Sequence, residues 1–293
     1  MISDFRTELS LVGGACTVAY KAYCAFSGRA VGIVIAANNG LPGGALGERE
    51  CVVNESDLLH RTQEESVWAA AVLANCGLDI QAQKKFYYET IFKKWGLVDS
   101  DTCCMTRQGV NYVETTDAEE YSRAYVQKDV KLINVVSSPN GLKKVESGTE
   151  FPAAFVFVGG PNTNDGWDTA NSPQSRTKNA KATSDYEFFK ACQTCAVRAA
   201  VDRAAEEGIE VLVMAPISTG INANAHATSR AIFSDFHTIL TNVLNEPVGI
   251  AGERRGQYFV DIVLPEVDAG RYQRLCPTQQ SAAATSSQFI FSE

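Results

Sequence analysis

Five apolar runs of strand length recur along the chain. They are VGIVIAA at 31–37, KLINVV at 131–136, AAFVFV at 153–158, IEVLVMAPI at 209–217 and QYFVDIVL at 257–264. Val and Ile follow one another in these runs without the polar alternation of a strand that faces water, which indicates strands buried on both faces. The sequence therefore predicts a sheet whose two faces are both covered.

Amphipathic segments of helix length separate several of these runs. The best marked is 184–208, which opens at Ser184, a predicted N-cap, and stops at Gly208, a predicted C′ glycine, before the next strand. Segments 62–77 and 81–96 have the same helical character. Because strands and helices alternate, we expect an α/β fold with three layers (α/β/α) and a mixed, mostly parallel sheet.

Two stretches, 99–120 and 159–183, are too polar for a core and are predicted to be long surface loops. The C-terminal tail, 276–293, is predicted to be loosely held. We find no internal repeat and no strong break in composition. The chain is therefore interpreted as a single domain over 1–293, with a core at about 28–265.

Composition and charge narrow the classes of function. The chain has 293 residues with a net charge of −8 and no long block of Lys or Arg, which argues against sequence-independent nucleic-acid binding. No apolar run reaches about 18 residues, and the N-terminus has no signal-peptide pattern. The nine cysteines are an odd number without a disulfide framework. We expect a cytoplasmic, monomeric protein with reduced thiols and no membrane partner.

Two glycine-containing loops follow predicted strands. Asn38 and Asn39, and then Gly43 and Gly44, come after the first strand. After the fourth run come Ser218, Thr219, Gly220, Ile221 and Asn222. Glycine lets backbone N–H groups converge on phosphate oxygens, and neighbouring carboxamides suit ribose hydroxyls, so two such loops suit a diphosphate. The alternative for residues 40–47 is an ordinary tight turn.

These pieces, taken in order, resemble a known family. The motifs are IAANNGLPGGALG, TQEES, FVFVGGPNTN and VLVMAPISTGIN. Over about 28–265 they are similar to the macrodomain superfamily, and most similar to its microbial-type poly(ADP-ribose) glycohydrolase branch. The resemblance implies a three-layer fold with an ADP-ribose cleft, and it requires neither a metal nor another cofactor.

The resemblance also assigns binding roles. Asn38 or Asn39 would contact the distal ribose of ADP-ribose, and Gly43 with Gly44 would form the first diphosphate loop. The second diphosphate loop would be formed by Ser218, Thr219, Gly220, Ile221 and Asn222.

The Gln63-Glu64-Glu65 motif carries the implied catalytic role. Glu65 would be the acid/base, Glu64 would orient the ribose, and Gln63 would belong to the substrate-binding set. Neighbours on a helix point about 100° apart, so we expect one carboxylate to act on the proton and the other to fix a hydroxyl. The alternative for Glu65 is a capping box with Thr62.

The chain departs from the glycohydrolase pattern in the segment 45–62. Ala45 replaces the third loop glycine, and the spacing to Gln63 is longer than in that branch. This resembles diverged hydrolases that act on ADP-ribosylated proteins such as ubiquitin, and the acidic surplus likewise favours a single ADP-ribose on a protein over a long polymer. The function expected is hydrolysis of the bond between ADP-ribose and a protein side chain or another ADP-ribose of poly(ADP-ribose). The alternative function is a non-catalytic ADP-ribose reader. A Rossmann oxidoreductase would need a G-x-G-x-x-G motif after its first strand, which is missing.

Five other residues could have either a structural or a functional role. Cys192 and Cys195 form a C-x-x-C inside a helix without a second pair, so we expect packing and not zinc. His226 and Asp57 are candidates for a supporting role near the site. Phe259 suits either adenine stacking or the core, and we favour the core.

Overall fold

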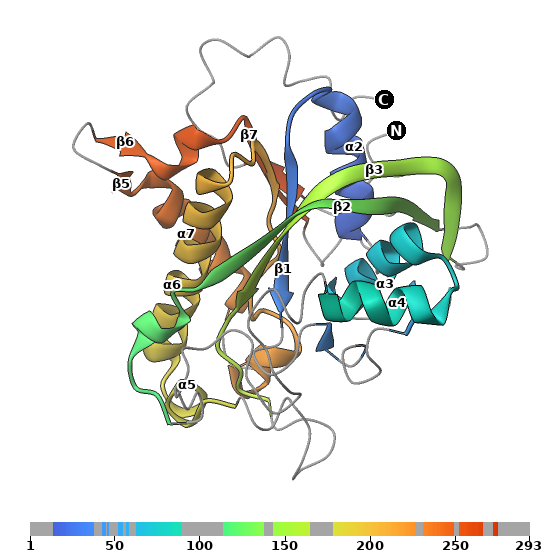
Figure 1. Cartoon of the computed structure of the whole chain (residues 1–293). Coiled ribbons are helices and arrows are strands. Elements are labelled where there is room, and N and C mark those ends of the chain that lie inside the picture. Colours follow the sequence, from blue (N-terminus) through green and yellow to red (C-terminus); the bar gives the residue numbers. More distant parts are fainter. Residues whose placement is uncertain are drawn as a thin grey trace.

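The computed structural model describes residues 14–37, 43, 44, 46, 52–54, 57, 58, 63–89, 114–137, 143–164, 178–226, 231–248, 252–265 and 272–274. Its centre is a six-stranded sheet in the order β2-β3-β1-β4-β7-β8 (Figure 1). The strands are β1 (Val31–Ala37), β2 (Ala124–Ser137), β3 (Lys143–Gly159), β4 (Val211–Val213), β7 (Asp261–Pro265) and β8 (Tyr272–Arg274).

The inner strands β3, β1, β4 and β7 pair in parallel, and the edge strands β2 and β8 are antiparallel to their neighbours. The sheet is therefore mixed and mostly parallel, as the sequence predicts. A short ribbon of β5 (Pro247–Val248) and β6 (Glu253–Arg254) stands apart from it.

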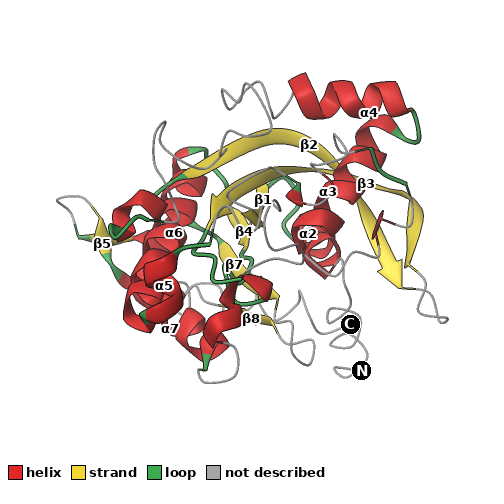
Figure 2. Cartoon of the chain, turned by 90° about the horizontal axis from the view of Figure 1, so that it is seen from below, coloured by secondary structure: helices red, strands yellow, loops and turns green. Residues whose placement is uncertain are grey.

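Helices cover both faces of the sheet and complete three layers (Figure 2). On one side lie α2 (Gly14–Ala25), α3 (Gln63–Cys76) and α4 (Ile80–Tyr87), and on the other α5 (Ala180–Ser184), α6 (Tyr186–Glu206) and α7 (Ile232–Asn245). Short 3-10 helices join these elements: η5 (Ala118–Tyr121), η7 (Ile221–His226) and η8 (Arg255–Tyr258).

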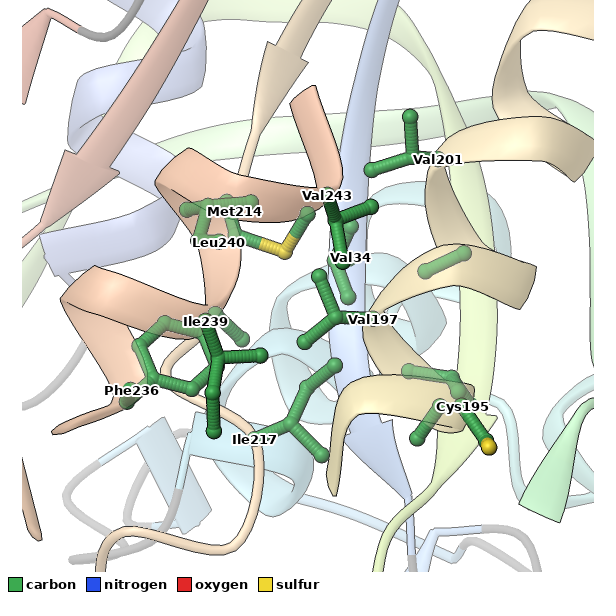
Figure 3. Packing of buried hydrophobic residues seen from close by; sticks show 14 of the residues in the cluster. Val34, Cys195, Val197, Val201, Met214, Ile217, Phe236, Ile239, Leu240 and Val243 are labelled. Carbon is green, nitrogen blue, oxygen red and sulfur yellow. The ribbon is translucent and has the colours of Figure 1, made fainter. Parts of the chain in front are cut away.

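The apolar runs have the burial that their composition indicates. On β1, Ile33 and Ile35 pack toward α2 and α3, whereas Val34 packs into the opposite cluster. Figure 3 shows Val34 beside Val197 of α6 and Val243 of α7. Both faces of the central strands are thus dry, because successive side chains of a strand point to opposite faces.

The structure corrects several predicted boundaries. The runs at 131–136 and 153–158 are parts of the much longer β2 and β3, which form one antiparallel ribbon. The 209–217 run is strand only over β4; the Met214 N–H makes the last ladder bond, to Val263 O, and the chain then turns at Ile217 and Ser218. The 257–264 run divides into η8 and β7.

The helix boundaries shift less. Helix α3 spans 63–76, within the predicted segment 62–77, with Gly77 at φ +57 after its end. Asp185, and not Ser184, caps α6, because its carboxylate accepts from the Phe188 N–H. Ser184 instead ends α5, a short helix that begins inside the predicted loop 159–183. The sequence interpretation had no element at α2.

β1 continues after β4 has ended. Pairing of the two strands stops at Ile33 opposite Val213, whereas β1 continues beside β3 to Ala37 opposite Gly159. After β1 the chain continues through α3, α4 and β2 to β3, which lies on one side of β1 in the sheet. β4 lies on the other side of β1. This is a topological switch point, where open α/β sheets bind ligands beyond the carboxyl ends of their strands.

Candidate functional site

Two adjacent carboxylates lie at the start of α3. Glu64 is 5% exposed and Glu65 is 7% exposed, although charged residues rarely reach such burial without partners. They occupy the first helical turn, where the free N–H groups and the helix dipole favour negative charge. Helix α3 therefore delivers two buried acidic groups to the carboxyl end of the sheet.

The loop after β1 closes on these carboxylates. The Gly43 N–H donates to Glu64 Oε1 at 2.8 Å. Gly44 has φ +54, and a Cβ built on it would lie 2.6 Å from Glu65 Oε1 and 3.3 Å from Glu64 Oε2. Glycine suits this position, because any other residue would have a strained positive φ and would push the acidic pair aside. The loop glycines and both carboxylates thus share one small space.

The two glutamates have different surroundings within that space. Glu64 is bonded to the loop backbone, so one of its oxygens is fixed by Gly43. Glu65 Oε1 is the atom nearest to the open side of Gly44. The expected division between a carboxylate that positions and one that transfers a proton stays a prediction.

Gln63 connects α3 to β1. Its Nε2 donates to Val34 O at 2.9 Å, and its Oε1 accepts from the Ala36 N–H at 3.3 Å. The predicted contact between Gln63 and substrate stays a prediction. What the structure adds is a pair of bonds that fixes the start of α3 against the end of β1.

The loop after β4 has a strained and tightly packed start. Ser218 has φ +53, which is uncommon for a residue other than glycine, and is 4% exposed. A Cβ on Gly160, just after β3, would lie 2.3 Å from Ser218 Oγ. Within the described residues no partner lies within hydrogen-bond distance of that hydroxyl oxygen. Strained, buried polar residues of this kind often mark functional sites.

Other bonds hold the same loop in place. Gln193 of α6 is fully buried and donates from Nε2 to Ile217 O at 2.6 Å. Thr219 donates its hydroxyl to Pro216 O at 2.9 Å. Farther along, Asn222 O accepts from both the N–H and the hydroxyl of Thr163, the segment after β3. Gly220 is exposed between these anchors. The segments after β1, β3 and β4 therefore lie at the same edge of the sheet.

Several predicted residues fall outside the site or outside the described residues. Asn38 and Asn39, with Thr62, are among the residues that the structure does not describe. Asp57 is 6% exposed and accepts from the Asn54 N–H at 2.9 Å. Phe259 is 2% exposed within the core beside α6 and α7, as the favoured interpretation has it.

His226 is a buried ring in the α5 to α6 layer. Its Nε2 lies 2.7 Å from Ala182 O, and its ring packs 4.9 Å from that of Tyr186 and 5.2 Å from that of Phe189. These contacts tie η7 to α5 and α6. His226 thus supports the end of the loop that starts at Ser218.

The C-x-x-C cysteines pack in the helix, as expected. Cys192 is fully buried and Cys195 is 5% exposed. Burial raises the pKa of both thiols, and the nearby Glu119 carboxylate raises that of Cys195 further. Both are therefore protonated at neutral pH and poor nucleophiles. Among the described residues, no group of three or more His, Cys, Asp or Glu side chains is placed to hold a metal ion.

Two residues that matter for the site were missed by the sequence interpretation. Gln193 is a fully buried amide on an apolar helix face, and Gly160 allows the close approach of Ser218. The available signals were a polar residue within the buried face of the 184–208 helix and a Gly-Gly-Pro immediately after a strand. Neither signal reveals its partner, because the partners come from distant segments.

Comparison with known proteins gave structural neighbours only. No protein-family model and no curated protein matches the chain. Three solved structures of poly(ADP-ribose) glycohydrolase from Thermomonospora curvata are similar to it. A point mutant has 12% identity and a TM-score of 0.47, with 88% of this chain and 72% of that one covered. The second has 13% identity and a TM-score of 0.45, with 89% and 72% covered. The third, bound to the inhibitor ADP-HPD, has 12% identity and a TM-score of 0.38, with 78% and 76% covered.

These enzymes bear the name of the branch that the sequence motifs resemble. In the described part of the chain, no helix is both long enough and apolar enough to span a bilayer.

Proposed function

We propose that this protein is an ADP-ribosyl hydrolase that cleaves the glycosidic bond at the distal ribose of ADP-ribose. One observation carries the proposal. The loop after β1 places Gly44 against both buried carboxylates of α3, with the position of its missing Cβ 2.6 Å from Glu65 Oε1. Acidic groups beside a backbone cradle are the combination needed to cleave a glycosidic bond in a substrate that is held by its diphosphate.

In this proposal Glu65 transfers the proton. Protonated Glu65 gives its proton to the departing oxygen of the glycosidic bond, water adds to the anomeric carbon, and the proton that water releases restores the acid. Glu64, held by the Gly43 N–H, orients the ribose. The proton transfer step contributes about 10² to 10⁴ in rate.

Backbone groups hold the diphosphate in the same proposal. The chain carries a net charge of −8, so a general positive field is not the source of anion binding. N–H groups of Gly43, Gly44 and the segment from Ser218 to Asn222 serve instead, with the ribose held by Asn38 or Asn39. The substrate is a single ADP-ribose on a protein, with ubiquitin one such target, and the enzyme acts as a cytoplasmic monomer.

The test compares four substrates: poly(ADP-ribose) and proteins modified through Ser, Arg or Glu/Asp. Free ADP-ribose is measured for the wild type, for Glu65→Gln and for Glu89→Gln, which alters an exposed carboxylate near the end of α4. We expect release from at least one protein-linked substrate, a loss of about 10² to 10⁴ in Glu65→Gln and no loss in the control.

Two results decide against the proposal. Equal turnover by Glu65→Gln removes Glu65 from the reaction. No release from any substrate, together with tight binding of ADP-ribose in calorimetry, makes the protein a non-catalytic reader.

A further inference from the structure

The end of β1 has backbone groups that β4 does not reach. Their last paired residues are Ile33 and Val213, and continuing that register would set Ala215 opposite Ile35. Instead, β4 ends at Val213, and the chain turns at Ile217 and at Ser218, whose φ is positive. The side of β1 that faces β4 must therefore find other hydrogen-bond partners beyond Ile33, since buried backbone groups are costly to leave unpaired.

The carboxamide of Gln63 occupies the vacated place. In a parallel ladder, a residue opposite Ile35 donates its N–H to the preceding residue's carbonyl and accepts from the following residue's N–H. Gln63 Nε2 donates to Val34 O at 2.9 Å, and its Oε1 accepts from the Ala36 N–H at 3.3 Å. One side-chain amide thus reproduces both bonds that a peptide group of β4 would have made.

From this geometry we infer that Gln63 is a positioning residue that fixes the first turn of α3 to the sheet and thereby holds Glu64 and Glu65 in place. This inference rests on the proposed function for its catalytic consequence. Because the two glutamates directly follow Gln63 and lie against Gly44, a shift of the helix start moves both carboxylates relative to the loop. Misplacement by about 1 Å costs on the order of 10² in rate.

The first experiment replaces Gln63 by Met, which has a similar shape but cannot bridge β1. We expect kcat for release of ADP-ribose to fall about 10- to 100-fold, while the Kd for ADP-ribose changes less than about threefold. A weaker Kd with unchanged kcat would instead mean that Gln63 contacts the substrate, and would overturn the inference.

The second variant, Gln63→Glu, separates positioning from simple damage to the fold. A protonated carboxyl has a donor and an acceptor and can replace the amide, whereas a carboxylate has only acceptors and faces Val34 O. The neighbouring Glu64 and Glu65 favour its protonated form. The ratio of variant to wild-type kcat should therefore rise as the pH falls from 8 to 5.5. A ratio that stays constant contradicts the inference.

Asn75 provides a matched control at the other end of α3. Its Nδ2 donates to Lys131 O of β2 at 2.9 Å, so Asn75→Leu also removes a side-chain amide that ties α3 to a strand. We expect Asn75→Leu to lower thermal stability without changing kcat. An equal loss of kcat in this control would show that any loosening of α3 suffices, and would overturn the specific role of Gln63.

Hydrogen exchange keeps the inference testable apart from hydrolysis. The Ala36 N–H, observed by NMR, should exchange faster in Gln63→Met than in the wild type and remain protected in Asn75→Leu. Unchanged protection overturns the ladder role of Gln63 even if the wild type is active. Lost protection in Gln63→Met, together with a wild type that is protected but releases no ADP-ribose, confirms the bridge and rejects only the proposed function.

Discussion

Gly44→Ala tests the close contact between the glycine loop and the acidic pair. The added Cβ would lie 2.6 Å from Glu65 Oε1, whereas ordinary contact begins at 3.4 Å, so the atoms must separate by 3.4 − 2.6 = 0.8 Å. The hydrogen bond from the Gly43 N–H to Glu64 restrains the loop, so the Glu65 side chain has to move. Glu65 is therefore displaced by most of an ångström, which predicts a loss of kcat on the order of 10².

The same substitution also has a cost in stability. Alanine at φ +54 is in the left-handed region, which disfavours L residues by about 1–2 kcal/mol. In a chain of this size, each kcal/mol lowers Tm by about 2–4 °C. A loss of activity therefore has to be separated from a loss of folded protein.

Gly77→Ala gives that separation. Gly77 follows the other end of α3 with φ +57, and a Cβ there meets nothing within 4 Å. Gly77→Ala therefore has the same kind of backbone strain as Gly44→Ala, without a collision between the new Cβ and a carboxylate. We would measure Tm by scanning calorimetry, kcat with saturating modified protein well below Tm, and ADP-ribose affinity by titration calorimetry. If Gly44→Ala keeps turnover within a few-fold of Gly77→Ala, the reasoning about the site is refuted.

Three further predictions concern the loop, the core and an ion pair. Ser218→Gly should be more stable than Ser218→Ala by about 1 kcal/mol in urea unfolding, because both lose the buried hydroxyl but only glycine relaxes φ +53; the reverse order would contradict the left-handed assignment. Phe155→Ala should lose about 3–5 kcal/mol of unfolding free energy, since Phe155 is fully buried against other aromatic rings, and a loss below 1 kcal/mol would contradict this packing. Hydrogen bonds from Arg198 hold the pKa of Glu246 below its ordinary 4.5, so the stability that Glu246 adds is present above that pH and lost as pH falls through its lower folded-state pKa. The difference in unfolding free energy between the wild type and Glu246→Gln should shrink as the pH falls from 6 to 3. A difference that grows over this range would contradict the prediction.

Local chemistry explains which elements the sequence predicted well. β1 is predicted with its observed bounds because VGIVIAA is apolar at every position, and burial on both faces needs no knowledge of neighbours. The end of helix α3 at Gly77 could be predicted because glycine adopts a positive φ without steric cost. The boundary between α5 and α6 was missed because Ser184 and Asp185 are both good caps, and only the bond to Phe188 chooses between them.

The same distinction applies to the candidate site. The sequence alone provided the Gln63-Glu64-Glu65 motif, the loop glycines and the segment from Ser218, since residue type indicates chemical capability. It could not show that Gln63 bridges Val34 and Ala36, because that bridge exists only where β4 stops short.

What the sequence by itself determined is therefore the α/β class, the covered sheet and the set of reactive groups. Tertiary structure decided the length of β4, the strained φ of Ser218 and the approach of Gly44 to Glu65. The physical reason is the distance along the chain over which each interaction acts. Hydrophobic periodicity and glycine conformation act within a few residues, whereas strand ends and close contacts are set by segments that meet only in the folded chain.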